Sequence, residues 1–160
     1  MSWLQRYQDP MTIQRVLHNS RTIAIVGLSG NELRASNFVG YYLRRHGYNV
    51  IPVNPREPEI LGQPSYPSLL EVPEPVDVVN VFRAPDALPE IAQDAVSITA
   101  GALWCQFGVT NEEAARIAED GGVPVIMDRC LKVEHARYIG RMHWLGFNTG
   151  LITYVRKGLQ

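Results

Sequence analysis

Short runs of apolar residues alternate with amphipathic segments along most of the chain. The runs are rich in β-branched residues and contain few polar positions, which is typical of parallel strands buried on both faces. Pro52 lies inside the second run and cannot donate a ladder hydrogen bond, which indicates an edge strand or a strand end. The runs predict five long strands, over residues 23–28, 48–54, 76–82, 102–107 and 123–128.

The segments between these runs have the spacing of helices. Gly47 ends one of them as a C-cap without Cβ strain. Thr110 is expected to cap another, with Glu113 completing a capping box, and Gly121 and Gly122 are expected to stop it after Asp120. The predicted helices cover residues 11–18, 36–46, 67–71, 85–96 and 110–120.

This alternation predicts a single Rossmann-like, doubly wound α/β domain, with a mainly parallel five-stranded sheet and helices on both faces. Right-handed crossovers place the carboxyl ends of all strands at one edge, where such folds bind ligands near the switch point. We expect one domain over residues 1–160, with its core at about 10–138 and a C-terminal extension at 139–160. Residues 151–157, LITYVRK, are expected to form a strand or a docked extension.

Composition narrows the classes of partner. The chain has 15 basic and 16 acidic residues, a net charge of −1, so no basic surface for nucleic acid is expected. The sequence has no run of about 18 apolar residues, so no membrane span is expected. The N-terminus lacks the apolar stretch of a signal peptide. Cys105 and Cys130 are expected to be free thiols, which suits a cytoplasmic location. A protein partner or a homodimer is left open.

The stretch TIAIVGLSGNELRAS, residues 22–36, indicates a strand, a glycine-containing turn and a helix start. Backbone N–H groups at such a turn attract anions. We interpret it as a phosphate or pyrophosphate cradle, and the alternative is a plain turn with a serine cap. The candidate ligand residues are Gly27, Ser29, Gly30, Arg34 and Ser36.

The dinucleotide fingerprint G-x-G-x-x-G is absent after the first strand. The second strand ends Val53-Asn54-Pro55-Arg56, where an NAD site commonly has an acidic residue for the ribose. Arg56 suits an additional ribose phosphate, which NADP carries at the 2′ position and coenzyme A at the 3′ position. The alternative for Arg56 is a solvated loop charge beside Glu57.

Two further strand ends supply candidate residues. Phe82, Arg83 and Ala84 follow the third strand, and Arg83 would add a second cation to the crevice rim. Gln106, in the fourth segment, is a plausible hydrogen-bond donor into the crevice, whereas an apolar-flanked Trp104 is more often a core residue.

The chain resembles the coenzyme A-binding domain of the succinyl-CoA synthetase alpha subunit and of ADP-forming acyl-CoA synthetases. It resembles small stand-alone bacterial CoA-binding proteins more closely still. The ordered set of motifs carries the resemblance, over roughly residues 10–138. The matching segments are IAIVGLS (23–29), RAS (34–36), GYNVIPVNP (47–55), ILGQPSYPSL (60–69), VDVVNVFRAP (76–85), ALWCQFGVTNEEA (102–114) and VPVIMDRCLKVEHAR (123–137).

The resemblance implies coenzyme A or an acyl-CoA as the ligand. The turn at Gly27–Gly30, with Arg34 and Ser36, would hold the pyrophosphate. Residues 53–56 would border the adenosine and its phosphate, and residues 82–84 would follow the adenine or pantetheine. The remaining residues, which would line the route of the pantetheine arm, are Trp104, Gln106 and Gly108.

The resemblance also limits the expected chemistry. No histidine of the chain has the context of the synthetases' phosphorylated histidine, so we expect binding without catalysis. A second hypothesis is an NADP-binding oxidoreductase or nucleotide-sensing domain. A third uses Cys130 in thiol exchange with coenzyme A, although a buried structural role suits this residue better. Asp128 and Arg129 are expected to pair, and no spacing indicates a metal site.

Overall fold

The structure is a computed structural model that describes residues 2–140. Five strands form one sheet in the order β2-β1-β5-β6-β7, and all neighbouring pairs are parallel. This confirms the predicted Rossmann-like α/β class, and Pro52 lies in an edge strand as its chemistry requires. The strands are shorter than predicted: β1 (Thr22–Val26), β2 (Asn49–Val53), β5 (Val78–Val81), β6 (Leu103–Cys105) and β7 (Val125–Met127).

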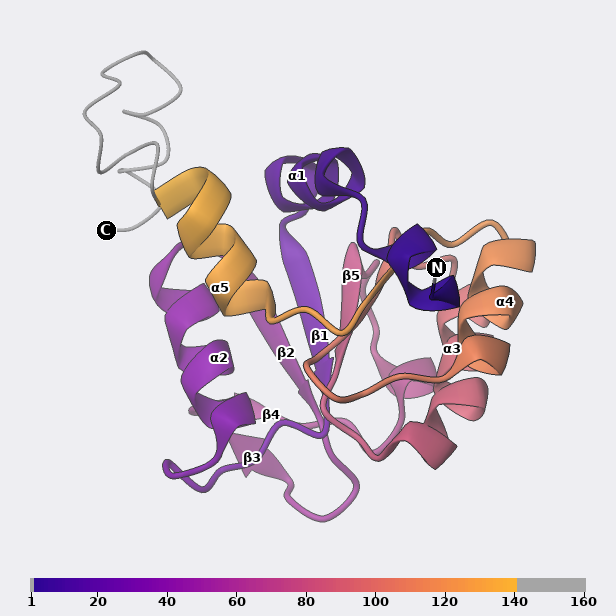
Figure 1. The fold of residues 1–160 in the computed structure, drawn as a ribbon. Coiled ribbons are helices and arrows are strands. Elements are labelled where there is room, and N and C mark those ends of the chain that lie inside the picture. Colours follow the sequence, from indigo (N-terminus) through magenta and orange to yellow (C-terminus); the bar gives the residue numbers. More distant parts are fainter. Residues whose placement is uncertain (1, 141–160) are drawn as a thin grey trace.

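Helices cover both faces of the sheet (Figure 1). On one face, α1 (Pro10–Asn19), α2 (Ala35–Arg45) and α5 (Leu131–His135) enclose a buried apolar core with side chains of β1 and β6. On the other, α3 (Leu88–Ser97) and α4 (Glu112–Asp120) enclose a second core. The short helical turns are η1 (Trp3–Tyr7), η2 (Leu69–Glu71), η3 (Pro85–Ala87) and the π-helical η4 (Ala136–Gly140).

Two predicted helix starts are corrected. The helix expected from Pro85 begins as the 3-10 turn η3 and becomes α-helical at Leu88. The capping box from Thr110 is wrong, because Asn111 is the N-cap of α4. Its side-chain oxygen accepts a hydrogen bond from the N–H of Ala114 at 2.9 Å. An asparagine one residue further along satisfies the helix start, so Glu113 does not occupy the capping-box position.

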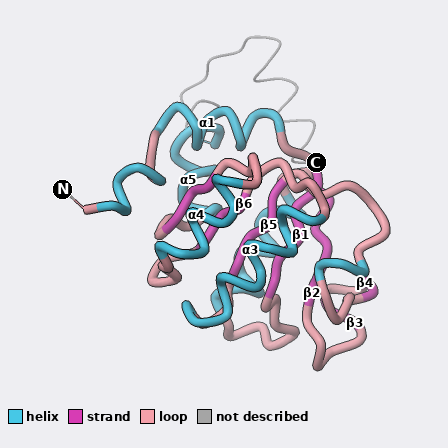
Figure 2. The backbone as a smooth tube through the Cα atoms, turned by 90° about the vertical axis from the view of Figure 1, so that its right-hand side faces the viewer, coloured by secondary structure: helices cyan, strands magenta, loops and turns pink. Residues whose placement is uncertain are grey.

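A small hairpin was not predicted. β3 (Glu59–Ile60) and β4 (Gln63–Pro64) pair antiparallel, and Leu61 and Gly62 between them both have positive φ. The hairpin lies beside the carboxyl end of β2 (Figure 2), where Tyr66 bridges to Val53. It therefore builds up one wall of the edge at which ligand binding is expected.

Residues 141–160 lie outside the described part of the chain, and with them the segment expected as a strand or docked extension. From residue 2 to residue 140, no helix has the length and apolar character needed to cross a membrane. Cys105 and Cys130 are both free and buried.

Candidate functional site

The switch point of the sheet lies between β1 and β5. The chain leaves β1 toward α2 on one face of the sheet and leaves β5 toward α3 on the other face. The loops after these two strands therefore start side by side and lead to opposite faces. Gly27 follows β1 with a φ of +91°. An added Cβ there would lie 2.9 Å from the carbonyl oxygen of Phe82 and 3.1 Å from Cδ of Arg83. The two loops thus approach each other where only glycine fits.

The turn between β1 and α2 is held in shape by its own side chains. The Ser36 hydroxyl accepts a hydrogen bond from the N–H of Ser29, and the Ser29 hydroxyl accepts one from the N–H of Asn31, both at 3.0 Å. The Asn37 side-chain amide donates to the carbonyl oxygen of Ser29 at 2.8 Å. Ser36 and Asn37 are buried. The backbone N–H groups of this turn therefore have fixed directions, as an anion site requires.

One N–H of this turn already holds an anion. The Gly30 N–H donates to the two carboxylate oxygens of Glu57, at 3.2 and 3.1 Å. The Asn54 side-chain amide donates to the same carboxylate at 3.3 Å and to the carbonyl oxygen of Leu28 at 2.9 Å. Asn54, at the end of β2, thereby fixes the β2 loop against the turn. The turn and the strand end together present donors to a negatively charged group.

A cavity of about 180 Å³ opens beside Val26 and Val53, at the carboxyl ends of β1 and β2. Pockets that enclose a whole drug-sized ligand have roughly 300 Å³ or more, so this one suits a single part of a larger molecule. Arg83 contributes a cation to its wall, and Glu90 and Asp94 contribute carboxyl groups. Burial, followed by the charge of Glu90, raises the pKa of Asp94. The apolar wall includes Val26, Val53, Leu69 and Ile91.

A larger depression, of about 570 Å³, lies between η1 and α4, away from the strand ends. Its charged side chains are paired with one another. Arg6 contacts Glu119 at 2.9 Å, and Arg116 contacts Glu112 at 2.8 Å. The depression is a poorer candidate than the strand ends, because folds of this class bind ligands at the carboxyl edge of the sheet.

A family model described as a CoA binding domain matches residues 21–136 of this chain. The chain belongs to this family of CoA-binding domains. The domain is 43% identical over 124 residues to the uncharacterized protein YneT of Bacillus subtilis (strain 168), an alignment that covers 78% of this chain and 92% of YneT. The relationship to YneT thus extends over nearly the whole of that protein.

A second relative is much longer than this domain. The alpha subunit of the ADP-forming acetate–CoA ligase II of Pyrococcus furiosus is 31% identical over 156 residues, which cover 88% of this chain and 32% of the subunit. Among solved structures, a hypothetical protein from Pyrococcus horikoshii OT3 has a TM-score of 0.82 and 34% identity, covering 88% of this chain and 99% of that one. The chain therefore aligns with about a third of a long ligase subunit and with nearly the whole of a solved protein.

The structure brings most of the predicted residues of this CoA-binding domain to one place. Around the switch point and the cavity lie Gly27, Ser29, Gly30, Ser36, Val53, Asn54, Pro55, Phe82 and Arg83. Three further residues at the same loops are exposed to solvent: Arg34, Arg56 and Ala84. Contact of any of these residues with a ligand stays a prediction.

The three predicted residues in and after β6 have different surroundings. Trp104 is 0% exposed, and its indole N–H donates to the carbonyl oxygen of Arg129 at 2.9 Å, so the ring lies in the core beneath the surface. Gln106 is 9% exposed, and its Oε1 has no hydrogen-bond partner among the described residues. The Gly108 N–H donates to the Asp128 carboxylate at 2.8 Å. A role for these three along a pantetheine arm stays a prediction, and for Trp104 it would be one of support.

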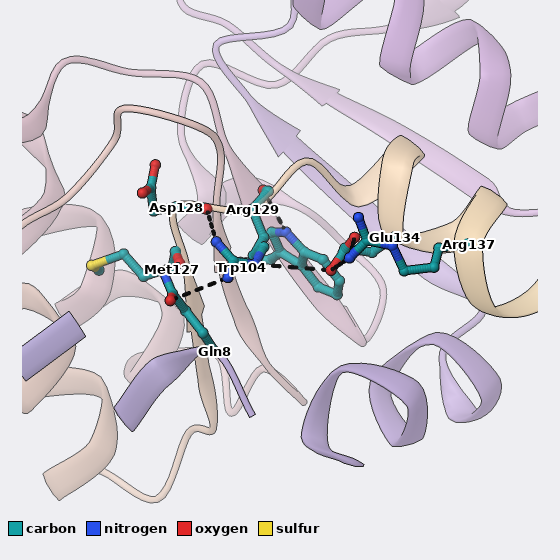
Figure 3. Close-up of polar contacts among 7 residues, drawn as sticks. All are labelled: Gln8, Trp104, Met127, Asp128, Arg129, Glu134 and Arg137. Atoms are coloured by element: carbon teal, nitrogen blue, oxygen red, sulfur yellow. Dashed lines mark hydrogen bonds and ion pairs between the residues drawn. The ribbon is translucent and has the colours of Figure 1, made fainter. Parts of the chain in front are cut away.

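The expected pairing of Asp128 with Arg129 is wrong (Figure 3). The Asp128 carboxylate accepts a hydrogen bond from the Gly108 N–H. The Arg129 guanidinium instead lies 3.9 Å from the buried Glu134 carboxylate, and it donates to the backbone carbonyl oxygen of Asp128 at 2.9 Å. Arg137 contacts Glu134 at 3.0 Å. Neighbouring side chains after a strand point in different directions, so adjacency in sequence was a poor guide.

Other titratable groups lie away from the cradle. His135 contacts Tyr42, His46 and Tyr48, at the edge of the sheet where the strands begin. Burial, followed by the nearby His46 and His18, lowers the pKa of His135 to about 4. Burial also raises the pKa of the Cys105 thiol, which disfavours its thiolate. Within residues 2–140, no group of three His, Cys, Asp or Glu side chains could hold a metal ion.

Glu57 was not predicted as a site residue, and neither were the two carboxyl groups of the cavity, Glu90 and Asp94. Glu57 stands four positions after Val53, the last residue of β2. A signal for it was therefore present, because loops that follow strand ends border the crevice in this fold. Glu90 and Asp94 lie one helical turn apart on α3, which gave no sign of the cavity.

Proposed function

We propose that this domain binds coenzyme A or an acyl-CoA at the carboxyl edge of the sheet and catalyses no reaction of its own. The observation that carries the proposal is the Gly30 N–H, which donates to the Glu57 carboxylate at the same edge of the sheet as the cavity. Membership of the CoA-binding domain family supports coenzyme A as the molecule that brings the anion.

The parts of coenzyme A fit the surroundings of the turn. Its pyrophosphate would take the place of the Glu57 carboxylate on the Gly30 N–H, near the start of α2, where the helix dipole favours negative charge. The cavity would take the adenine ring, with its apolar wall against the base and Arg83 at the rim. Arg56, exposed after β2, would contact the ribose phosphate.

The positions of the histidine and cysteine side chains support binding without catalysis. General acid–base chemistry most often uses a histidine in contact with the reacting atoms. His46 and His135 instead lie in an aromatic cluster with Tyr42 and Tyr48, toward the amino ends of the strands. Cys130 is 6% exposed and packs in the core on the α2 face. Neither cysteine therefore presents an accessible thiol to a ligand at the strand ends.

Calorimetric titration of the ligand-free protein with CoA, dephospho-CoA, NADP and NAD tests this proposal. We expect CoA to bind with a Kd of about 1 μM or tighter. Loss of the 3′-phosphate should weaken binding, and both nicotinamide nucleotides should bind more weakly than CoA. NADP binding without CoA binding would instead support the dinucleotide hypothesis that Arg56 also suits. Absence of binding to all four would refute the proposal.

A further inference from the structure

The Glu57 carboxylate occupies the Gly30 N–H, the donor to which the proposed function assigns the ligand pyrophosphate. Both of its oxygens accept from the Gly30 N–H, and one also accepts from the Asn54 side-chain amide. An added Cβ at Gly30 would collide with this carboxylate, so the two residues are in close contact. Carboxylates and phosphates use the same kind of donor, a backbone N–H with a fixed direction. The two anions therefore compete for one set of donors.

Backbone anchors hold Glu57 in this position. Its loop is closed at both ends by hydrogen bonds to the residues after β4. The Asn54 N–H donates to the carbonyl oxygen of Tyr66 at 2.9 Å, and the Ser65 N–H donates to that of Pro58 at 2.9 Å. Among residues 2–140, no ion pair involves Glu57. Its negative charge is thus balanced only by the donors that a ligand phosphate would use. A phosphate bound at the same donors would repel the Glu57 carboxylate.

We propose that Glu57 is an internal competitor of the ligand phosphate and sets the affinity of this site. The inference rests on the proposed function, because it takes the ligand to be coenzyme A. A phosphate that reaches the Gly30 N–H must displace the Glu57 carboxylate into solvent. The hydrogen bonds lost on displacement then reduce the apparent affinity.

Titration of CoA into the full chain and into matched variants tests the competition. Glu57→Ala should tighten CoA binding about tenfold, the equivalent of one charge-assisted hydrogen bond. Glu57→Gln should give a smaller gain, because an amide oxygen can still accept from Gly30 but has no charge. Glu59→Ala is the control: it removes an exposed carboxylate at the start of β3, directly after this loop. Solvent screening should leave its CoA affinity within about twofold of wild type. Tighter CoA binding in the Glu57 variants alone would support competition between Glu57 and the ligand phosphate.

Two outcomes would overturn the proposal. If CoA binds the wild type but Glu57→Ala binds it equally or more weakly, Glu57 supports the site and does not compete with the ligand. A gain of the same size in Glu59→Ala would show a general effect of net charge.

Inorganic pyrophosphate separates failure of this proposal from failure of the proposed function. The amide NMR signal of Gly30 is followed while pyrophosphate is added to wild type and to Glu57→Ala in magnesium-free buffer. If no variant binds CoA, the proposed function fails, yet a Gly30 shift at about tenfold lower pyrophosphate in Glu57→Ala still supports competition. Equal midpoints in the two proteins, or no shift in either, would overturn the competitor.

Discussion

Gly27 and the carbonyl oxygen of Phe82 approach so closely that a Cβ on Gly27 would lie 2.9 Å from that oxygen. This contact joins the loops after β1 and β5 at the switch point, and Gly27 also has a φ of +91°. We predict that Gly27→Ala lowers the free energy of unfolding by about 1–3 kcal/mol, through backbone strain and displacement of the Phe82 loop. CoA affinity should fall as well, because the cradle and the cavity share this contact. Chemical denaturation and calorimetry measure the two effects.

Gly62→Ala is the matched control for Gly27→Ala. Gly62 also has a positive φ, +73°, but a Cβ there would have nothing within 4 Å. It should show the backbone cost, about 1 kcal/mol, with CoA affinity unchanged. Equal loss of CoA affinity in both variants would contradict the importance of the Gly27–Phe82 contact.

His135 should make stability depend on pH. Its Nδ1 lies 2.8 Å from the Tyr42 hydroxyl, and His46, Tyr48 and Lys132 face the same cluster. Because burial lowers its pKa to about 4, the unfolded chain takes up the proton first as pH falls. Its contribution to stability is complete above about pH 6.5 and is lost between there and pH 4, a loss of about 3 kcal/mol.

Denaturation curves from pH 4 to pH 8 check this dependence. The double variant Tyr42→Phe, His135→Phe removes the ionisable ring and the hydroxyl that would otherwise be left unpaired. It should flatten the curve between pH 6.5 and pH 4 relative to wild type. An unchanged slope would assign the acid sensitivity to other groups, of which His46 is one, since burial lowers its pKa too.

Arg56→Ala should discriminate between two ligands. Arg56 is exposed after β2, where a ribose phosphate is expected. The variant should weaken CoA binding about tenfold and leave dephospho-CoA binding unchanged, because only CoA has the 3′-phosphate. Arg15→Ala, on α1, is the control for a general loss of positive charge. Equal weakening of both ligands would place the phosphate elsewhere.

Glu134 is expected to matter for stability and not for ligand binding. Its carboxylate is 2% exposed and contacts Arg137 at 3.0 Å and Arg129 at 3.9 Å (Figure 3). Glu134→Ala would leave the partly buried Arg129 without its counter-ion, at a cost of about 2 kcal/mol. Thermal denaturation should show a lower Tm, with CoA affinity unchanged. Glu112→Ala, which breaks the exposed pair with Arg116, should leave the Tm nearly unchanged.

The fold was largely predictable because its signals are local. Runs such as IAIV are continuously apolar, and a strand buried on both faces needs that pattern. Pro52 indicated the edge position of β2 because a proline lacks one ladder donor. The start of α4 was misplaced by one residue, since Thr110 and Asn111 are both good caps and only the folded geometry selects Asn111. The two-residue strands β3 and β4 have too little pattern to detect.

The site was predictable only in outline. The rule that ligands bind at strand ends located the loops that hold Gly27, Asn54 and Arg83, but it gave no contacts between them. The Gly30–Glu57 contact joins residues 27 positions apart through a loop, and no periodicity encodes such a contact. Trp104 is the middle residue of β6 and is fully buried, as its apolar neighbours in the sequence favoured.

The most direct test of the central claim is to map CoA binding by amide NMR shifts on the labelled protein. The account predicts the largest shifts at Gly27, Gly30 and Asn54 and in the loop around Arg83, with little change near Trp3 and Arg116. Shifts concentrated in the depression between η1 and α4, or none at saturating CoA, would contradict a CoA site at the switch point of the sheet.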